Sequence, residues 1–364
     1  MDALYIHVPF CMKKCAYCDF HSFEGRMSES KKYVDYLIKD FKNWENVRYD
    51  TVYFGGGTPS LLEPEEIGRI LKEIDILPEA EITLELNPAT ANFEKLIKFK
   101  KNGINRLSIG MQSFNDNILK TLGRLHNSQK AKKIFNDARR AGFENISIDL
   151  MFAVPGQGIE ELKKDLEEIK KLNPEHVSIY SLIWEEGTPF WDMMQKGILN
   201  PCENDLEADM FELIIETLNN LGYIQYEISN FSKPNKESRH NTKYWENKEY
   251  LALGIGASFY TLGYRGKNLM TFDDYYKFVD ENKKPWLESE KVNNPKEYEY
   301  MLGLRLLEKG IIPTEENIKN ICENLKNEGY LEEVEKNRYI LSKKGLFFAN
   351  DVFENFLFTV EELC

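Results

Sequence analysis

Tyr-Ile-His-Val-Pro-Phe-Cys-Met-Lys-Lys-Cys-Ala-Tyr-Cys-Asp-Phe, residues 5–20, is the stretch that decides the fold of this chain. It holds three of the six cysteines, Cys11, Cys15 and Cys18, in a Cys-x3-Cys-x2-Cys spacing. An apolar run over residues 3–8 precedes them and Pro9 ends it, so we expect the cysteines on a loop that leaves a first strand. Thiolates hold iron–sulfur clusters, normally one for each iron. Three thiolates therefore leave one iron of a four-iron cluster open to another ligand.

The same cysteines allow two other interpretations. With His21 they could form a zinc site of the Cys3His type, or they could be three structural thiols. The local spacing excludes neither, and the motifs further along the chain favour the cluster.

The bulk composition describes an ordinary globular protein, with 42% hydrophobic and 29% charged residues in a chain of 364. This length suggests two or three domains. The net charge of −13 argues against nucleic acid as a general partner. No apolar run approaches the ~20 residues that a membrane span needs, and the start of the chain has no signal-peptide pattern. Clustered cysteines that must stay reduced favour the cytoplasm.

Short apolar runs alternate with amphipathic segments over the first half of the chain, which is typical of βα units on a parallel sheet. The runs predict strands over residues 4–8, 51–54, 81–86, 106–110, 146–152 and 176–183. The intervening segments predict helices over residues 30–44, 64–74, 93–101, 128–141 and 159–172. Six such strands predict an α/β fold with a partial (β/α)6 barrel.

The second half of the chain loses this repeat. It predicts a helix over 205–220, a strand over 223–228 and an irregular, aromatic-rich stretch to about residue 286. Helices over 295–307 and 315–327, a hairpin over 330–341 and a closing helix over 344–358 then follow in an order that resembles a winged helix. We therefore expect three parts: residues 1–222, 223–290, and a C-terminal α+β domain over 291–364. Residues 290–364 hold 10 Lys and Arg against 15 Asp and Glu, so electrostatics oppose DNA binding there.

Polar residues stand at the ends of the predicted strands, where a barrel of this kind builds its site. Strand two ends in Gly55-Gly56-Gly57-Thr58-Pro59, whose glycines let a ligand approach the backbone closely. A carboxylate that follows a strand can accept hydrogen bonds from a ribose or an ammonium group, and a guanidinium can pair with a ligand carboxylate. The further candidates at strand ends are Glu85, Gln112, Arg124 and Asp149.

The cysteine spacing, with the aromatic Tyr17 between the second and third cysteines, resembles the radical S-adenosylmethionine (radical SAM) superfamily. The Gly-Gly-Gly-Thr-Pro segment resembles the Gly-Gly-Glu motif of that family, with Thr58 in place of the glutamate. The resemblance implies a [4Fe-4S] cluster on Cys11, Cys15 and Cys18, whose open iron binds the amino and carboxylate groups of S-adenosylmethionine. It also implies a reductant for the cluster. The residues that match the S-adenosylmethionine contacts of oxygen-independent coproporphyrinogen oxidases are Tyr5, Gly56, Gly57, Thr58, Glu85, Gln112, Arg124 and Asp149.

Within that group the chain resembles the radical SAM haem chaperones more than the oxidase proper. The oxidase carries a fourth cysteine two residues after the third, where this chain has Phe20, and an N-terminal extension, whereas this chain begins ten residues before Cys11. Residues 239–245 read Arg-His-Asn-Thr-Lys-Tyr-Trp. The neutral imidazole of His240 is a suitable axial ligand for haem iron, and Tyr244 and Trp245 offer flat surfaces to a porphyrin. The alternative is a hydrogen-bonded histidine with core aromatics.

Three hypotheses follow for the function. The first is a haem chaperone that binds haem, the cluster and S-adenosylmethionine and hands haem to acceptor proteins. The second is an oxygen-independent coproporphyrinogen III oxidase, and the third is a zinc-stabilised interaction protein. Among the remaining histidines, His7 lies on the first strand near the cysteines, whereas His21, His126 and His176 have no distinguishing context.

Overall fold

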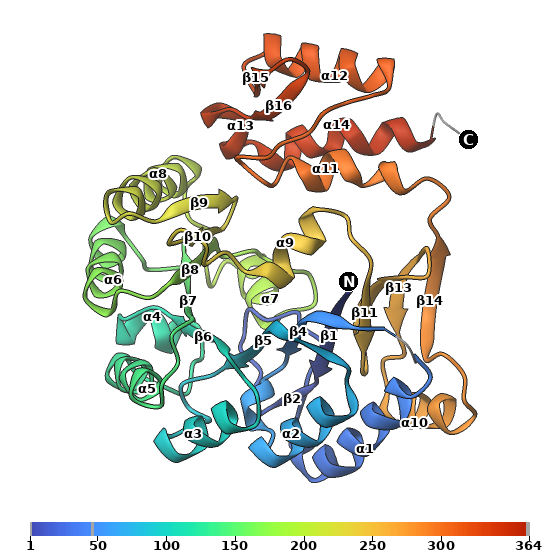
Figure 1. Cartoon of the computed structure of the whole chain (residues 1–364). Helices are drawn as coiled ribbons and strands as arrows, with labels where there is room; N and C mark the ends of the chain where they lie inside the picture. Colours follow the sequence, from blue (N-terminus) through green and yellow to red (C-terminus); the bar gives the residue numbers. More distant parts are fainter. Residues whose placement is uncertain (1, 45–46, 362–364) are drawn as a thin grey trace.

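The computed structural model describes residues 2–44 and 47–361. Six parallel strands lie side by side in it, which confirms the predicted partial barrel (Figure 1). They are β1 (Asp2–Val8), β4 (Tyr49–Gly56), β5 (Ile76–Leu86), β6 (Arg106–Gln112), β7 (Ile146–Phe152) and β8 (His176–Ser181). Two short strands, β2 (Phe10–Cys11) and β3 (Phe23–Glu24), pair with each other beyond the end of β1.

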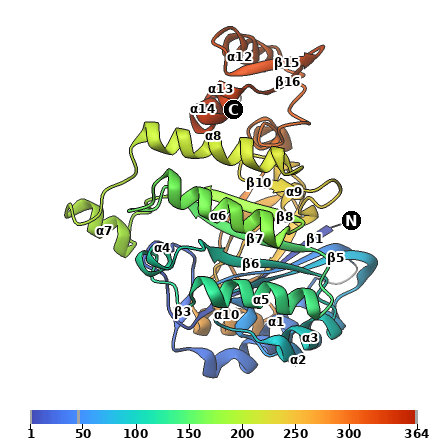
Figure 2. The same cartoon turned by 90° about the vertical axis from the view of Figure 1, so that its left-hand side faces the viewer.

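Helices cover the outer face of these strands (Figure 2). The predicted ones are present as α1 (Ser30–Phe41), α2 (Pro64–Glu73), α3 (Phe93–Lys101), α5 (Ser128–Arg140), α6 (Ile159–Leu172) and α8 (Asn204–Asn220). Asn92 and Asn127 begin α3 and α5 by accepting hydrogen bonds from backbone N–H groups three residues on, at 2.9 Å each. Shorter helical segments are η1 (Met27–Glu29), η2 (Pro59–Leu61), α4 (Asp116–Thr121) and α7 (Pro189–Gln195).

The two faces of the barrel strands differ in polarity because successive side chains point to opposite sides of a sheet. On β4, Val52 and Phe54 are buried in the main apolar core, which also holds residues of the outer helices. Thr51 and Tyr53 alternate with them and point the other way, into the barrel. Each barrel strand follows the same rule, so the interior carries polar side chains: Glu81, Thr83 and Glu85 on β5, Arg106 and Ser108 on β6, Ser147 and Asp149 on β7, and His176 and Tyr180 on β8.

The sheet continues past the six barrel strands, so the prediction of an irregular stretch up to residue 286 was wrong. On one side, β10 (Asn230–Ser232) pairs antiparallel with β8, and β9 (Ile224–Glu227) pairs with β10. On the other, β11 (Tyr250–Leu253) pairs parallel with β1, with Tyr5 opposite Ala252. The edge is completed by β12 (Ser258–Thr261), β13 (Tyr264–Asn268) and β14 (Trp286–Lys291), with α9 (Arg239–Trp245) and α10 (Phe272–Asp280) between strands. The boundary expected after residue 222 therefore lies within one sheet.

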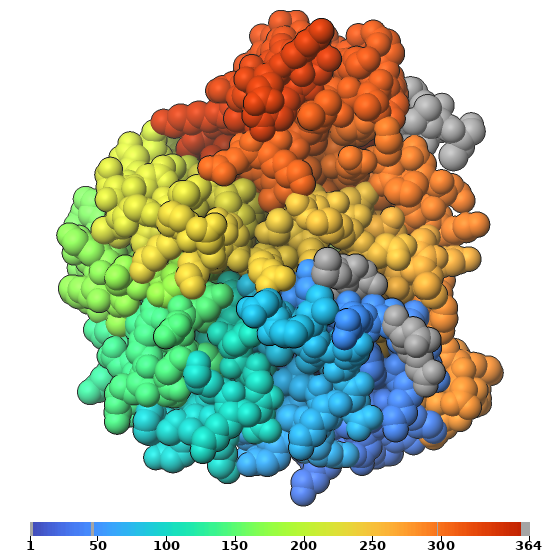
Figure 3. Space-filling model, in the orientation of Figure 1, coloured from blue at the N-terminus to red at the C-terminus, as the bar shows by residue number. Residues whose placement is uncertain are grey.

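The C-terminal part has its own apolar core, built around Leu304, Cys322 and Val352. Its elements are η3 (Pro295–Glu297), α11 (Glu299–Gly303), α12 (Glu316–Asn327), the hairpin β15 (Leu331–Glu335) and β16 (Arg338–Leu341), α13 (Lys343–Phe347) and α14 (Ala349–Glu361). It sits above the segment around α9 and β9, coloured yellow in Figure 3. The element order agrees with the prediction, and the likeness to a winged helix stays a prediction.

Two helices expected in this part are shorter than predicted. The helix expected over 295–307 ends at Gly303 because the following backbone pairs with β9: the N–H of Leu307 donates to the carbonyl of Tyr226 over 3.1 Å. The closing helix is broken at Phe348, whose backbone leaves the helical conformation between α13 and α14. In the described residues, no helix is both long enough and apolar enough to cross a membrane.

Candidate functional site

One cavity brings together most of the residues predicted for the site. The three cysteines line it, together with the predicted residues Gly56, Gly57, Thr58, Glu85, Gln112, Arg124 and Asp149. Most of these residues come from the loop after β1 and from the C-terminal ends of β4 to β6, as expected for a parallel barrel. Asp149 lies in the middle of β7, and Arg124, which was expected at a strand end, lies instead in the loop between α4 and α5. Lys13, Tyr17, Phe20, Ser108 and Tyr180 complete much of the remaining wall.

The cysteine loop is tied to the rest of the chain at several points. Cys11 closes β2, where it pairs with Glu24 of β3. The N–H of Cys18 donates to the carbonyl of Cys15 over 3.1 Å, which forms a turn between the second and third cysteines. The carbonyl of Ala16 accepts a hydrogen bond from Phe190 of α7. All three are free cysteines. The loop is thus held with its thiols facing one cavity, an arrangement that fits a cluster with three protein ligands.

The glycines after β4 form a cradle that no other residue would fit. Gly56 has φ +112°, and a Cβ there would come within 2.5 Å of the His7 ring. A Cβ on Gly57 would lie 2.7 Å from the Phe10 carbonyl oxygen and 3.1 Å from the Cys11 sulfur. A side chain at either position would collide with these neighbours. Glycine is therefore required here, because the backbone of residues 56 and 57 lies so close to them.

Glu85 joins the glycine loop to the barrel interior. Its carboxylate accepts hydrogen bonds from the Tyr53 hydroxyl at 3.0 Å and from the Gly56 N–H at 3.2 Å. Burial, reinforced by the neighbouring charge of Asp149, raises the pKa of Glu85 to about 7. Asp149 accepts hydrogen bonds from Ser108 and Ser147, and burial raises its pKa as well. The site therefore contains two buried carboxyl groups whose ionised form a further donor or a cation would stabilise.

Two further polar residues reach across the cavity wall. Arg124 donates to the Gly110 carbonyl oxygen over 2.7 Å and lies 3.5 Å from the Cys15 sulfur. Gln112 accepts a hydrogen bond from the Tyr180 hydroxyl at 3.2 Å. Its backbone has φ +66°, which is unusual for a residue with a side chain.

Tyr5 is not among the side chains that line this cavity in the described residues. Its hydroxyl lies 3.0 Å from His7 Nδ1, and His7 Nε2 lies 2.8 Å from the carbonyl oxygen of His21. His21 in turn places Nε2 2.7 Å from the Met270 carbonyl. Across residues 2–44 and 47–361, no group of three or more His, Cys, Asp or Glu side chains is arranged to hold a single metal ion.

The residues predicted to contact haem lie at the opposite end of the barrel strands. His240 on α9 is fully buried, with Nδ1 2.9 Å from the Thr51 hydroxyl and Nε2 2.7 Å from the Tyr244 hydroxyl. Thr51 stands near the start of β4, whereas the glycines end it. Burial, followed by the charges of Lys243 and Arg106, lowers the pKa of His240 to about 3, so the ring is neutral. Both ring nitrogens are engaged, and an axial bond to iron requires one of them to be released.

Trp245 at the end of α9 faces the C-terminal part of the chain. The guanidinium carbon of Arg305 lies 4.2 Å from the centre of its ring, and the same guanidinium pairs with Glu227 at 3.7 Å. The start of α9 is fixed to the barrel, because the N–H groups of Arg239 and His240 donate to the Glu81 carboxylate. Helix α9 is therefore held between the barrel and the C-terminal part (Figure 1).

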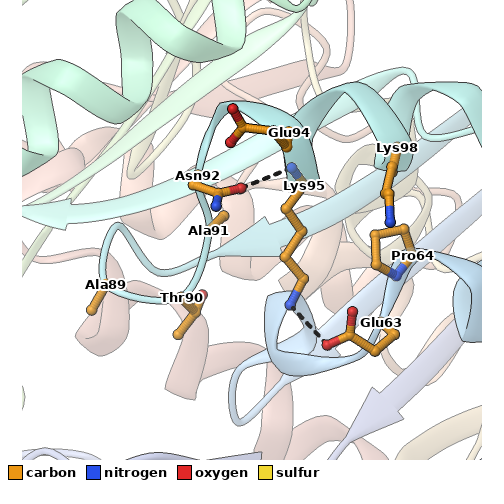
Figure 4. A pocket seen from close by; sticks show the side chains of 9 residues that line it. All are labelled: Glu63, Pro64, Ala89, Thr90, Ala91, Asn92, Glu94, Lys95 and Lys98. Carbon is orange, nitrogen blue, oxygen red and sulfur yellow. Dashed lines mark hydrogen bonds and ion pairs between the residues drawn. The ribbon is translucent and has the colours of Figure 1, made fainter.

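A second hollow, of about 430 Å³, lies on the outer surface beside α2 and α3 (Figure 4). Lys95 and Glu63 face each other across it at 3.9 Å, and Asn92 caps the N–H of Lys95. It has no lining residue in common with the cysteine cavity. Lacking thiols and facing solvent, it offers no equivalent chemistry.

Several residues of the site escaped the sequence reasoning. Tyr53, Ser147 and Tyr180 lie within strands rather than at their ends, and each hydrogen bonds to a predicted site residue. The sequence carried a signal for them, because each interrupts the apolar run of its strand at a position whose side chain points into the barrel. Polar residues at alternate positions of a predicted barrel strand are thus candidates for the lining of the interior.

Comparisons with known proteins agree with this geometry. The model of the radical SAM superfamily matches residues 5–169. The chain is 36% identical to a Lactococcus lactis protein named "Heme chaperone HemW", over 98% of this chain and 97% of that protein. It is 34% identical to the Bacillus subtilis protein of the same name, over 98% and 99%. Among solved structures, coproporphyrinogen III oxidase (HemN) from Escherichia coli, a radical SAM enzyme, superposes with a TM-score of 0.82 at 20% identity, covering 97% of this chain and 89% of that one. At that identity the likeness shows the fold alone.

Proposed function

The chain belongs to the HemW haem chaperone family of the radical SAM superfamily, and on this basis we propose that it binds haem and transfers it to haem-acceptor proteins. The observation that carries the proposal is identity of 34–36% over nearly the full length of both chains. The proposal includes a [4Fe-4S] cluster, S-adenosylmethionine, a reductant for the cluster and a cytoplasmic location, where thiols stay reduced.

The residues of the cavity fit the two cofactors. Cys11, Cys15 and Cys18 would hold the cluster, and the glycine cradle with Thr58 would admit the methionine part of S-adenosylmethionine beside it. Glu85 and Asp149 would accept hydrogen bonds from its hydroxyl or ammonium groups, with Gln112 and Arg124 as further contacts. Tyr5 would act through His7, which it touches. When bound, the cluster and S-adenosylmethionine supply radical chemistry, and the protein supplies their orientation.

For haem we propose contacts from His240, Tyr244 and Trp245. Both ring nitrogens of His240 have partners in the closed arrangement, so ligation would require the Tyr244 or Thr51 hydrogen bond to open. The release of α9 from Arg305 and Glu81 would supply that movement. Support comes from the residue types alone: a neutral imidazole with two aromatic rings.

The experiment that tests the function is a haem titration of the anaerobically reconstituted protein, followed by mixing with a haem-free acceptor protein. Stoichiometric haem binding and its transfer to the acceptor are expected. A parallel incubation with coproporphyrinogen III, S-adenosylmethionine and a reductant tests the oxidase alternative. Robust formation of protoporphyrinogen IX, with no haem transfer, would contradict the chaperone proposal. The exposed Phe20, which stands where the oxidase has its fourth cysteine, favours the chaperone.

A further inference from the structure

An unbroken chain of hydrogen bonds runs through the barrel interior from the cysteine cavity to the start of α9. The Ser147 hydroxyl donates to Asp149 Oδ1 over 3.0 Å, and His176 Nδ1 lies 2.8 Å from the same hydroxyl. His176 Nε2 lies 2.9 Å from the hydroxyl of Tyr226, whose oxygen accepts the backbone N–H of Ser238 at 3.2 Å. Ser238 is the residue that caps the N-terminus of α9. This relay connects the helix that carries the His-Asn-x-x-Tyr-Trp segment to a carboxylate of the cavity.

When Asp149 is ionised, the donors and acceptors of this relay fit a single direction. Ser147 gives its single proton to Asp149, so its oxygen must accept from His176 Nδ1–H. Burial lowers the pKa of His176 well below its usual range, so the ring is neutral and Nε2 is an acceptor. Tyr226 can then give its proton to Nε2 while its oxygen accepts from Ser238. Every group of the relay donates toward Asp149. The relay therefore fixes the orientation of this carboxylate as a hydrogen-bond acceptor.

A second, parallel connection reaches Glu85. Tyr244 on α9 contacts His240 Nε2 at 2.7 Å, and the His240 ring stacks on the ring of Tyr53 with a centroid distance of 5.1 Å and an interplanar angle of 27°. The Tyr53 hydroxyl donates to Glu85, which in turn accepts the Gly56 N–H. The two connections share their origin on α9 and end on the two carboxyl groups of the cavity.

Both histidines are buried in a manner that leaves them little freedom to move. His176 has 1% of its surface exposed and His240 none. A buried polar group that loses its partner costs more free energy than the hydrogen bond contributed, so each link constrains the next. A displacement of α9 must therefore move both histidines or break their bonds.

We propose that His176 and His240 are positioning residues, through which α9 sets the orientation of Asp149 and Glu85 toward S-adenosylmethionine. The proposal rests on the proposed binding of S-adenosylmethionine in this cavity and is independent of haem. In this proposal the His-Asn-x-x-Tyr-Trp segment supports the cofactor site, although the segment lies at the opposite end of the barrel from the cysteines.

The test compares S-adenosylmethionine affinity among variants of the cluster-loaded, haem-free protein by equilibrium dialysis. Tyr226→Phe removes the hydroxyl of the relay to Asp149, and Tyr53→Phe removes the hydroxyl of the second connection, to Glu85. Both variants keep the aromatic ring. We expect the Kd to rise about three- to tenfold in each, the effect of one lost hydrogen bond, with iron and sulfide content unchanged. Tyr223→Phe is the matched control, because its buried hydroxyl donates to the Pro174 carbonyl at 2.7 Å, away from the cavity. The control should lose thermal stability without a change in Kd.

A second measurement covers the case in which a variant fails to fold. Nitrogen-15 NMR of the wild-type histidine side chains should show His176 protonated on Nδ1, and the chain has only five histidines to resolve. Three results would overturn the proposal. They are protonation of His176 on Nε2, an unchanged Kd for S-adenosylmethionine in both Tyr226→Phe and Tyr53→Phe, and an equal rise of this Kd in the Tyr223→Phe control. Wild-type protein that binds no S-adenosylmethionine would instead overturn the proposed function, and the NMR result would still decide whether the relay exists.

Discussion

The hydroxyl oxygen of Thr58 lies 3.7 Å from the sulfur of Cys11, and both residues are more than nine-tenths buried. A donor at this position faces a sulfur that would carry negative charge when it holds iron. Hydrogen bonds to such sulfurs raise the reduction potential, because they stabilise the additional electron of the reduced cluster. The threonine that stands in place of the glutamate of the Gly-Gly-Glu motif thus contacts one of the three proposed cluster ligands.

Thr58→Val should make the cluster harder to reduce. Loss of the hydroxyl removes one donor to the Cys11 thiolate, so we expect the midpoint potential to fall by an amount on the order of tens of millivolts. A redox titration followed by electron paramagnetic resonance measures it. Ser60→Ala is the control, since that hydroxyl pairs with Thr90 at 2.6 Å. An unchanged potential in Thr58→Val would show that the hydroxyl does not reach the sulfur of the loaded protein.

Cys15→Ala should abolish cluster binding. The two remaining thiolates would leave two of the four irons without a protein ligand, and they would not retain the cluster. Iron and acid-labile sulfide, measured on anaerobically reconstituted protein, should fall to background. Cys202→Ala is the control, being a free, partly buried cysteine that does not line the cavity. Full iron content in Cys15→Ala would contradict the assignment of the ligands, and zinc without sulfide in the wild type would favour the zinc hypothesis.

S-adenosylmethionine binding should depend on pH through Glu85. The carboxyl group, with its pKa raised to about 7, keeps its proton below that pH in the free site. The sulfonium and ammonium charges of the ligand favour the ionised form, so binding releases a proton and affinity rises from about pH 5 to 7, then levels off. Calorimetry in buffers of different ionisation enthalpy measures this release. Glu85→Gln should remove this release; an identical pH profile in the variant would assign the release to another group.

His240→Ala should affect both haem binding and stability. The substitution leaves the buried Thr51 and Tyr244 hydroxyls without their shared partner, for a loss of about 2–4 kcal/mol in the free energy of unfolding. Urea unfolding measures this loss. The Soret band of the haem-loaded variant should shift or disappear, and an unshifted band would place the axial ligand on another residue. Tyr244→Phe, which keeps the ring and the imidazole, separates the two effects.

Arg305→Ala should loosen the contact between the C-terminal part and α9. Removing the guanidinium exposes the Trp245 ring and leaves the buried Glu227 carboxylate without its cation, for a loss of about 1–3 kcal/mol. Limited proteolysis should then cut near residues 291–298 faster than in the wild type. Arg338→Ala is the control, because that arginine pairs with Glu335 within the C-terminal hairpin; equal cleavage of both variants would contradict the role given to Arg305.

The sequence predicted the barrel strands well because their apolar runs are long and their helices begin and end at clear signals, such as Asn92 and Gly103. It did not predict β10 to β13, which have three to five residues each. Their pairing is set by distant partners, as when Tyr250 meets Ala3, and so short a segment carries no periodicity of its own.

The site was predictable where chemistry depends on spacing along the chain and unpredictable where it depends on packing. The cysteines and the strand-end residues could be identified because their motif or their position at a strand end is local. His176 had no distinguishing context, yet it bridges Ser147 and Tyr226 from β7 and β9. The full burial of His240 was equally hidden, because residue types on α9 do not reveal which of its faces meets the barrel.

The pairing of β1 with β11 has a consequence for the order of events during synthesis. The strand that precedes the cysteines is made first, but one of its two neighbours is completed only at Leu253. At the usual rates of translation, roughly 10–50 s separate the two. Over that interval the nascent chain has an unpaired strand edge beside its thiols, open to aggregation and oxidation. We expect iron–sulfur loading to be post-translational, and the delay between synthesis and loading to be the step at which the cell must protect this protein.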